Sequence, residues 1–123
     1  MSKKILLMED EETLAGMYKI KFEKSGYQVF VAANGEIGLP MIKREKPDLV
    51  LLDIIMPKMD GFVVLEKMMQ DDDIKDIPVF MLTNLGQDED IKRGEELGAS
   101  GYYVKANLTP GELVKKINKF FKI

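Results

Sequence analysis

Residues 47–53 read Pro-Asp-Leu-Val-Leu-Leu-Asp, an uninterrupted apolar run between two aspartates. The run from Leu49 to Leu52 is too short for a core helix and has the length of a strand that is covered on both faces. The chain then turns through Ile54-Ile55-Met56-Pro57, so Asp53 stands at the carboxyl end of the predicted strand. The carboxyl ends of parallel strands are the usual place for a ligand site.

Further short apolar segments resemble this run, and longer segments with helical spacing separate them. The predicted strands are Ile5–Met8, Val29–Val31, Leu49–Leu52, Val79–Leu82 and Tyr102–Val104. Strands that alternate with helices indicate parallel pairing, with helices on both faces of the sheet. We therefore expect an α/β fold: a doubly wound five-stranded parallel sheet of order 2-1-3-4-5, flanked by five helices and flavodoxin-like.

Helix boundaries follow from capping residues and apolar spacing. The first predicted helix has an apolar face of Leu14, Met17, Tyr18 and Phe22 and ends at Ser25-Gly26. The second follows Asn34 and has Ile37, Met41 and Ile42 on its apolar face. The third begins at Asp60. A fourth helix, over 88–97, has few apolar anchors and an internal Gly94. Thr109-Pro110-Gly111-Glu112 is a capping box that starts the fifth, whose predicted apolar face includes Phe120.

The composition excludes several classes of function. The chain has 123 residues, which predicts a single domain over 1–123, and 18 basic against 21 acidic residues give a net charge of −3. This charge argues against direct nucleic-acid binding. The absence of Cys and His excludes disulfides, zinc-thiolate sites and Ser-His-Asp catalysis. No apolar run is long enough for a signal peptide or a membrane span, so we expect a cytoplasmic protein.

Polar residues follow four of the predicted strands. Glu9 and Asp10 come after the first, Asp53 after the third, Thr83 after the fourth and Lys105 after the fifth. Each residue alone has an ordinary explanation as a helix-end charge, a turn residue, a cap or a solvated lysine. On the expected strand order, however, the three acids meet at one crevice. Their mutual repulsion predicts either protonation or a bound cation, and Mg²⁺ suits such oxygen ligands.

These residues stand in a pattern that closely resembles the receiver domain of bacterial two-component response regulators. The resemblance runs from about Lys4 to Phe121 and includes residues 5–11, 47–53, 56–61, 82–84 and 98–105. Asp53 and Thr83 are 30 positions apart, and Thr83 and Lys105 are 22 apart, as in that family. The most specific element is Asp-x-x-Met-Pro-x-Met-Asp-Gly at 53–61.

The resemblance implies a phosphoacceptor signalling domain rather than a metabolic enzyme, either a single-domain regulator of the chemotaxis type or a receiver excised from a longer protein. Asp53 would accept a phosphoryl group from the phosphohistidine of a sensor histidine kinase or phosphotransfer protein. Mg²⁺ would be held by Glu9, Asp10, Asp53 and the backbone carbonyl of Ile55. Thr83 and Lys105 would contact phosphoryl oxygens. The resemblance does not identify the downstream protein target.

Thr83 and Tyr102 would form the switch, and the fourth helix, fifth strand and fifth helix would form the output surface. Strand alternation sends Tyr102 and its neighbour Tyr103 to opposite faces, so either ring remains a candidate by position alone.

Two departures from the family pattern carry expectations. The family usually has proline after the lysine, whereas this chain has Lys105-Ala106, which predicts a trans peptide bond. Ser100-Gly101 stands where regulators with winged-helix output domains carry an acidic pair used in dimer contacts, which favours a monomer.

Three other functions remain as alternatives. A phosphatase of the haloacid dehalogenase type needs a second aspartate two residues after the nucleophile, where this chain has Ile55. A flavodoxin-like redox carrier needs a phosphate-binding loop after the first strand, where the acids from Glu9 to Glu12 would repel a phosphate. A degenerate receiver would lack part of the site, but here the acids, Thr83 and Lys105 are all present.

Overall fold

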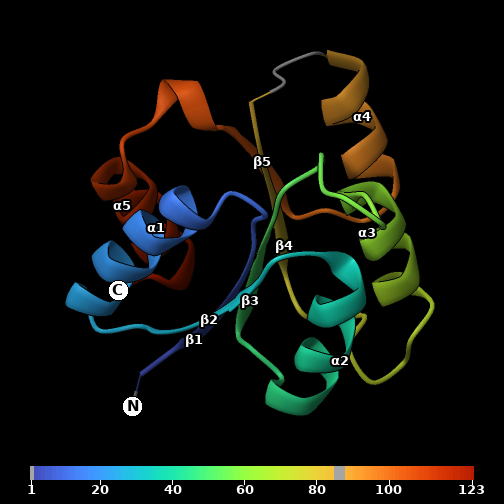
Figure 1. The fold of residues 1–123 in the computed structure, drawn as a ribbon, viewed down its shortest axis with the longest axis horizontal. Coiled ribbons are helices and arrows are strands. Elements are labelled where there is room, and N and C mark those ends of the chain that lie inside the picture. Colours follow the sequence, from blue (N-terminus) through green and yellow to red (C-terminus); the bar gives the residue numbers. More distant parts are fainter. Residues whose placement is uncertain (1, 85–87) are drawn as a thin grey trace.

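Five parallel strands form the centre of the protein in a computed structural model that describes residues 2–84 and 88–123 (Figure 1). The strands are β1 (Lys4–Met8), β2 (Gln28–Ala32), β3 (Leu49–Leu52), β4 (Val79–Thr83) and β5 (Gly101–Val104). They lie side by side in the order β2-β1-β3-β4-β5, and every neighbouring pair is parallel. The predicted fold class and strand order are confirmed.

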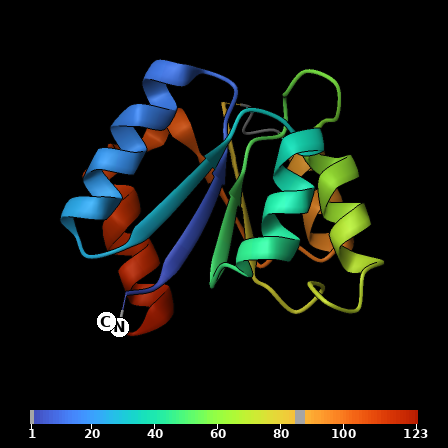
Figure 2. The same ribbon diagram turned by 60° about the horizontal axis from the view of Figure 1, so that its bottom comes forward.

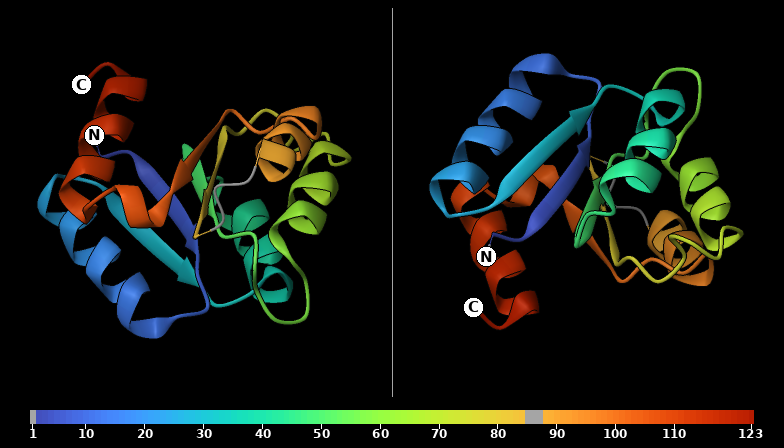
Figure 3. Two further views of the ribbon diagram at one scale, coloured as in Figure 1. Left: turned by 90° about the horizontal axis from the view of Figure 1, so that it is seen from above. Right: turned by 90° about the horizontal axis from the view of Figure 1, so that it is seen from below.

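The helices cover both faces of this sheet. They are α1 (Glu12–Lys24), α2 (Gly35–Glu45), α3 (Gly61–Met69), α4 (Asp88–Glu96) and α5 (Pro110–Phe121), and a short 3₁₀ turn, Lys105–Asn107, follows β5. Helices α1 and α5 lie on one face, and α2, α3 and α4 lie on the other (Figure 2). The views from above and below show the same two layers (Figure 3). Among the described residues, no helix has the length and apolar character needed to span a bilayer.

The two halves of the core differ in chemistry. On the α1 and α5 side, aromatic residues such as Tyr18, Phe22 and Phe80 pack with the aliphatic residues of the strands. On the α2, α3 and α4 side, the buried cluster includes Met8, Met56, Met68 and Met81. Unbranched methionine side chains adapt to irregular gaps better than rings do.

Capping residues fix the helix boundaries as predicted. The side chain of Asn34 accepts a hydrogen bond from the Ile37 amide, and that of Asp60 accepts one from the Val63 amide. Thr109 and Glu112 form the reciprocal bonds of a capping box at the start of α5. These short-range bonds satisfy amides that the helix itself leaves unpaired.

Three predicted core residues are instead exposed. Met17 in α1 and Ile37 in α2 are each 51% exposed, and Phe120 in α5 is 41% exposed. In α2 the reason is glycine: Gly35 and Gly38 are buried, and the side chain of Met8 lies directly against Gly38. Because the sheet packs onto the helix backbone there, the neighbouring isoleucine falls on the solvent side.

Proline 40 does not end the second helix. Helix α2 continues through Pro40 to Glu45, so its missing amide removes one hydrogen bond without shortening the helix.

Gly61 allows α3 to start directly against the backbone of Asp53. A Cβ atom at Gly61 would collide with the Asp53 carbonyl oxygen and lie 2.9 Å from the Ile54 Cα atom. The Gly61 amide also donates a 2.7 Å hydrogen bond to the Ile54 carbonyl. The close approach of these two backbones therefore places Asp53 relative to α3.

We expect Gly61→Ala to destabilise the protein by about 1–3 kcal/mol, because backbone atoms cannot move aside as a flexible side chain can. Gly16→Ala in α1 is the matched control, since no heavy atom beyond its own helix backbone and chain neighbours lies within 4 Å of the added Cβ atom. The control should gain up to about 1 kcal/mol from helix propensity. Urea unfolding curves measure the unfolding free energies of both variants. Equal stabilities of the two variants would contradict the close backbone contact at Gly61.

Candidate functional site

All the polar residues predicted at the strand ends meet at the carboxyl edge of the sheet. Met8 and Leu52, the last residues of β1 and β3, are paired in register, and so are Thr83 and Val104 at the ends of β4 and β5. A pocket of about 390 Å³ opens at this edge, and it is lined by Glu9, Asp10, Glu11, Asp53, Ile55, Thr83, Asn84 and Lys105. The structure therefore brings together residues that are as far apart as 9 and 105 in the sequence.

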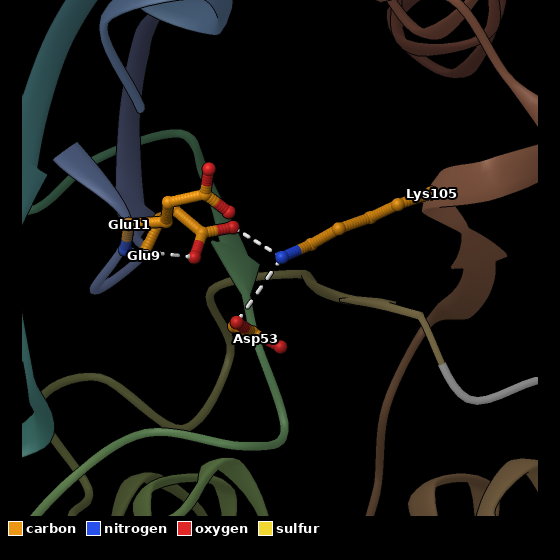
Figure 4. A network of polar contacts seen from close by, with 4 residues as sticks. All are labelled: Glu9, Glu11, Asp53 and Lys105. Carbon is orange, nitrogen blue, oxygen red and sulfur yellow. Dashed lines mark hydrogen bonds and ion pairs between the residues drawn. The ribbon is translucent and has the colours of Figure 1, made fainter. Parts of the chain in front are cut away.

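Lys105 joins two of the acids (Figure 4). Its ammonium group donates hydrogen bonds to Glu9 Oε1 and, at 3.1 Å, to Asp53 Oδ2. All three side chains are at least 92% buried. A buried ammonium between two buried carboxylates is far more favourable than any of the three charges alone.

The second oxygen of Glu9 is also engaged. Glu9 Oε2 accepts a hydrogen bond of 3.2 Å from the Glu11 amide. Sequence reasoning missed this contact and the pairing of Glu9 with Lys105. A backbone amide has no side-chain signature, and the pairing depends on how far two side chains reach across the sheet.

The environment shifts the pKa of both central groups. Burial raises the pKa of Asp53 to about 6, with the Lys105 charge opposing and the Glu9 charge adding to the rise. The pKa of Lys105 is raised as well: burial lowers it, but its hydrogen bond to Glu9 and the charges of Asp53 and Glu9 outweigh that effect. Lys105 is therefore charged at neutral pH.

Three carboxylates could hold a cation at this edge. One oxygen each from Glu9, Asp10 and Asp53 lie within 4.8 Å of one another. With Lys105 charged, the four groups carry two net negative charges when the acids are ionised, which matches a divalent ion. Ile55 also lines the pocket, and because its side chain contains no oxygen, its only oxygen donor there is the backbone carbonyl. These hard oxygen donors fit Mg²⁺ or Mn²⁺.

The two tyrosines of β5 face opposite layers, as strand alternation requires. Tyr102 packs against the core cluster on the α3 and α4 side, and Tyr103 stacks on Phe80 on the other side. Burial raises the pKa of Tyr102, the Asp90 carboxylate raises it further, and a hydrogen bond with Thr83 lowers it. Tyr102, rather than Tyr103, is thus the tyrosine in contact with the site.

The bond after Lys105 is trans, as predicted, since the described residues contain no cis peptide bond. The chain continues from Lys105 into the 3₁₀ turn that ends at Asn107.

The raised pKa of Asp53 predicts a pH-dependent stability in metal-free buffer. The folded protein binds a proton at Asp53 more tightly than the unfolded chain does, so stability falls as pH rises from about 4 to 6 and stays low above it. Asp53→Asn removes this titration and should be more stable at pH 8 by on the order of 1–2 kcal/mol. Thermal melts with EDTA measure the difference. A gap between the two proteins that did not shrink toward pH 4 would contradict the assignment.

Comparisons with known proteins show the family of the chain. The chain matches the family described as response regulator receiver domain over residues 5–118. It is 39% identical over 120 residues to the probable transcriptional regulator ycf27 of Cyanophora paradoxa, covering 98% of this chain and 48% of the relative. The chain therefore spans about half the length of that curated relative.

Two solved structures are similar along nearly their whole length. The chemotaxis protein CheY4 of Vibrio cholerae superimposes with a TM-score of 0.90 at 28% identity and covers 97% of this chain and 98% of its own. The Mn²⁺-bound form of the response regulator Rcp1 superimposes with a TM-score of 0.84 at 28% identity and covers 97% and 94%. The chain belongs to the response regulator receiver domain family.

Proposed function

We propose that this chain is a phosphoacceptor signalling domain over residues 1–123 and not a metabolic enzyme. Asp53 accepts a phosphoryl group from the phosphohistidine of a sensor histidine kinase or a phosphotransfer protein. The observation that carries the proposal is the Asp53 carboxylate in a pocket that also holds three further acids, the Thr83 hydroxyl and the buried Lys105 ammonium.

The chemistry is a transfer between two nucleophiles. A carboxylate oxygen of Asp53 forms a bond to phosphorus as the nitrogen–phosphorus bond of the donor breaks, and the electron pair of that bond returns to the imidazole ring. The Lys105 ammonium donates a hydrogen bond to one phosphoryl oxygen, and the Thr83 hydroxyl donates to another. Both lie at the same pocket as Asp53.

The residues proposed to hold Mg²⁺ are Asp10, Asp53 and the Ile55 carbonyl, with Glu9 acting through a water molecule. When bound, the ion supplies the positive charge that lets an anionic phosphoryl group approach several carboxylates. The carboxylate oxygens within 4.8 Å of one another support this assignment. The Mn²⁺-bound form of the similar regulator Rcp1 supports a divalent ion in such a protein.

The proposed switch runs from Thr83 through Tyr102 to the surface of α4, β5 and α5. Thr83 moves toward the new phosphoryl oxygens, and Tyr102, which hydrogen bonds with it, follows. Helix α4 has few buried contacts with the rest of the protein. Of its nine residues, Gly94 is buried. Arg93 lies over the ring of Phe62, with its guanidinium carbon 4.3 Å from the ring centroid. Elements with few buried contacts are shifted by modest energies.

The partners of this output surface follow from the same proposal. The domain is a cytoplasmic monomer that regulates a further protein, with no direct contact to nucleic acid or membrane. The curated relative ycf27 is named a probable transcriptional regulator, but it is about twice as long as this chain. Its regulatory activity is therefore not assigned to these residues.

Phosphorylation is tested with acetyl phosphate and Mg²⁺. Intact mass spectrometry should show one added phosphoryl group on the wild type and none on Asp53→Asn. Omission of Mg²⁺ should prevent the modification. Modification of Asp53→Asn to the same extent, or none of the wild type with acetyl phosphate or beryllofluoride, would refute the proposal.

Hydrogen exchange over residues 88–97 tests the weak attachment of α4. Arg93→Met removes the cation–π contact with Phe62, worth about 0.5–1 kcal/mol, and should speed exchange about two- to fivefold. Lys92→Met, at an exposed neighbour in the same helix, is the matched control and should change little. The phosphoryl mimic beryllofluoride should also change exchange there. Equal protection in all four samples would argue against α4 as the mobile part.

A further inference from the structure

Glu9 has a role beyond charge at the pocket. We propose that Glu9 is a positioning residue that holds the Lys105 ammonium in place for phosphoryl contact, an inference that rests on the proposed function. It follows from the length of the Glu9 side chain, its burial and the engagement of both its oxygens.

The first step is the distance that the contact must span. Glu9 follows β1 and Lys105 follows β5, and β3 and β4 lie between these strands. Three strand spacings separate the two backbones by about 14 Å. The Lys105 side chain extends across the pocket toward the acids, and the Glu9 side chain covers the remaining distance (Figure 4). An aspartate at position 9 would be shorter by one carbon–carbon bond, about 1.5 Å.

The second step is the rigidity of Glu9. Its backbone amide donates a 3.0 Å hydrogen bond to the Ala32 carbonyl of β2, and its Oε2 atom accepts from the Glu11 amide. Only 2% of its side chain is exposed. The remaining oxygen, Oε1, is therefore presented to Lys105 from a fixed position.

The third step concerns what happens at Asp53. Before transfer, Lys105 has two carboxylate partners, Glu9 and Asp53. Transfer converts the Asp53 carboxylate into an acyl phosphate, but it leaves Glu9 unchanged. An ammonium has three donors, so Lys105 keeps one on Glu9 and directs another at a phosphoryl oxygen. Without Glu9, this buried ammonium would lose its permanent counter-charge.

The acids of the pocket therefore have different proposed roles. Glu9 has one oxygen on Lys105 and the other on the Glu11 amide, whereas Asp10 is exposed at the pocket. Asp10 and Asp53 are thus the carboxylates assigned to direct metal bonds. The side chain of Glu9 serves the lysine.

Glu9→Asp is the decisive variant, because it keeps the charge and shortens the reach. Glu12→Asp makes the same change at an exposed acid in the first turn of α1 and is the matched control. The first readout is acetylation of individual lysines by an amine-reactive ester in metal-free buffer, mapped by mass spectrometry. The second is Mg²⁺ affinity from an NMR titration, with Asp10→Asn for comparison. The third is the rate of phosphorylation by acetyl phosphate.

In Glu9→Asp, we expect Lys105 to be acetylated at least about fivefold faster, because its hydrogen bond is lost, while the other lysines keep their wild-type rates. Phosphorylation should slow about tenfold, and Mg²⁺ affinity should change less than about threefold, well below the loss in Asp10→Asn. Glu12→Asp should match the wild type in every readout. Wild-type reactivity of Lys105 in Glu9→Asp, or a loss of Mg²⁺ affinity equal to that of Asp10→Asn, would overturn the inference.

A measurement on the unaltered protein does not depend on how the variants fold. In the beryllofluoride-bound wild type, NMR should show a nuclear Overhauser effect between the Lys105 ammonium protons and the Glu9 Hγ protons. Its absence would overturn the inference even though the proposed function holds. Failure of the wild type to form the beryllofluoride adduct would instead count against the proposed function.

Discussion

The hydrogen-bonded ammonium of Lys105 is the interaction on which the whole carboxyl edge of the sheet depends. Two buried carboxylates, Glu9 and Asp53, lie close together there, and burial raises the pKa of Asp53. Lys105 provides the opposite charge, and its own pKa rises in return. The acids can therefore remain close together, which is the condition for binding a divalent ion and for the proposed transfer of a phosphoryl group.

The parallel sheet supplies the rigid frame for this interaction. Strand order and register place Glu9, Asp53, Thr83 and Lys105 at one edge, although they come from distant parts of the chain. The close contact of Gly61 with the Asp53 carbonyl holds the loop after β3. Helix α4 packs against this frame through the buried Gly94 and through the cation–π contact of Arg93 with Phe62. The rigid sheet and the adjustable helix of the proposed switch therefore lie beside each other.

Local sequence patterns predicted most of the fold, but they failed where tertiary packing determines which helix residues are buried. Periodicity located every strand and helix, and Asn34, Asp60 and Thr109 marked the helix starts, because caps act over only three or four residues. Met17 and Ile37 were assigned to buried faces and are exposed. Apolar spacing treats glycine as neutral, whereas in α2 Met8 packs onto Gly38, and Val64 and Met59 pack onto Gly35.

By itself, the sequence determined the α/β alternation, the strand order expected for it and the polar residues at the strand ends. The tertiary structure alone decided that Glu9 reaches Lys105, that the Glu11 amide holds Glu9, and that Tyr102 rather than Tyr103 contacts Thr83. The reason is one of range. Helix caps and side-chain periods depend on neighbours along the chain, whereas a contact between β1 and β5 depends on two intervening strands and on the lengths of two side chains.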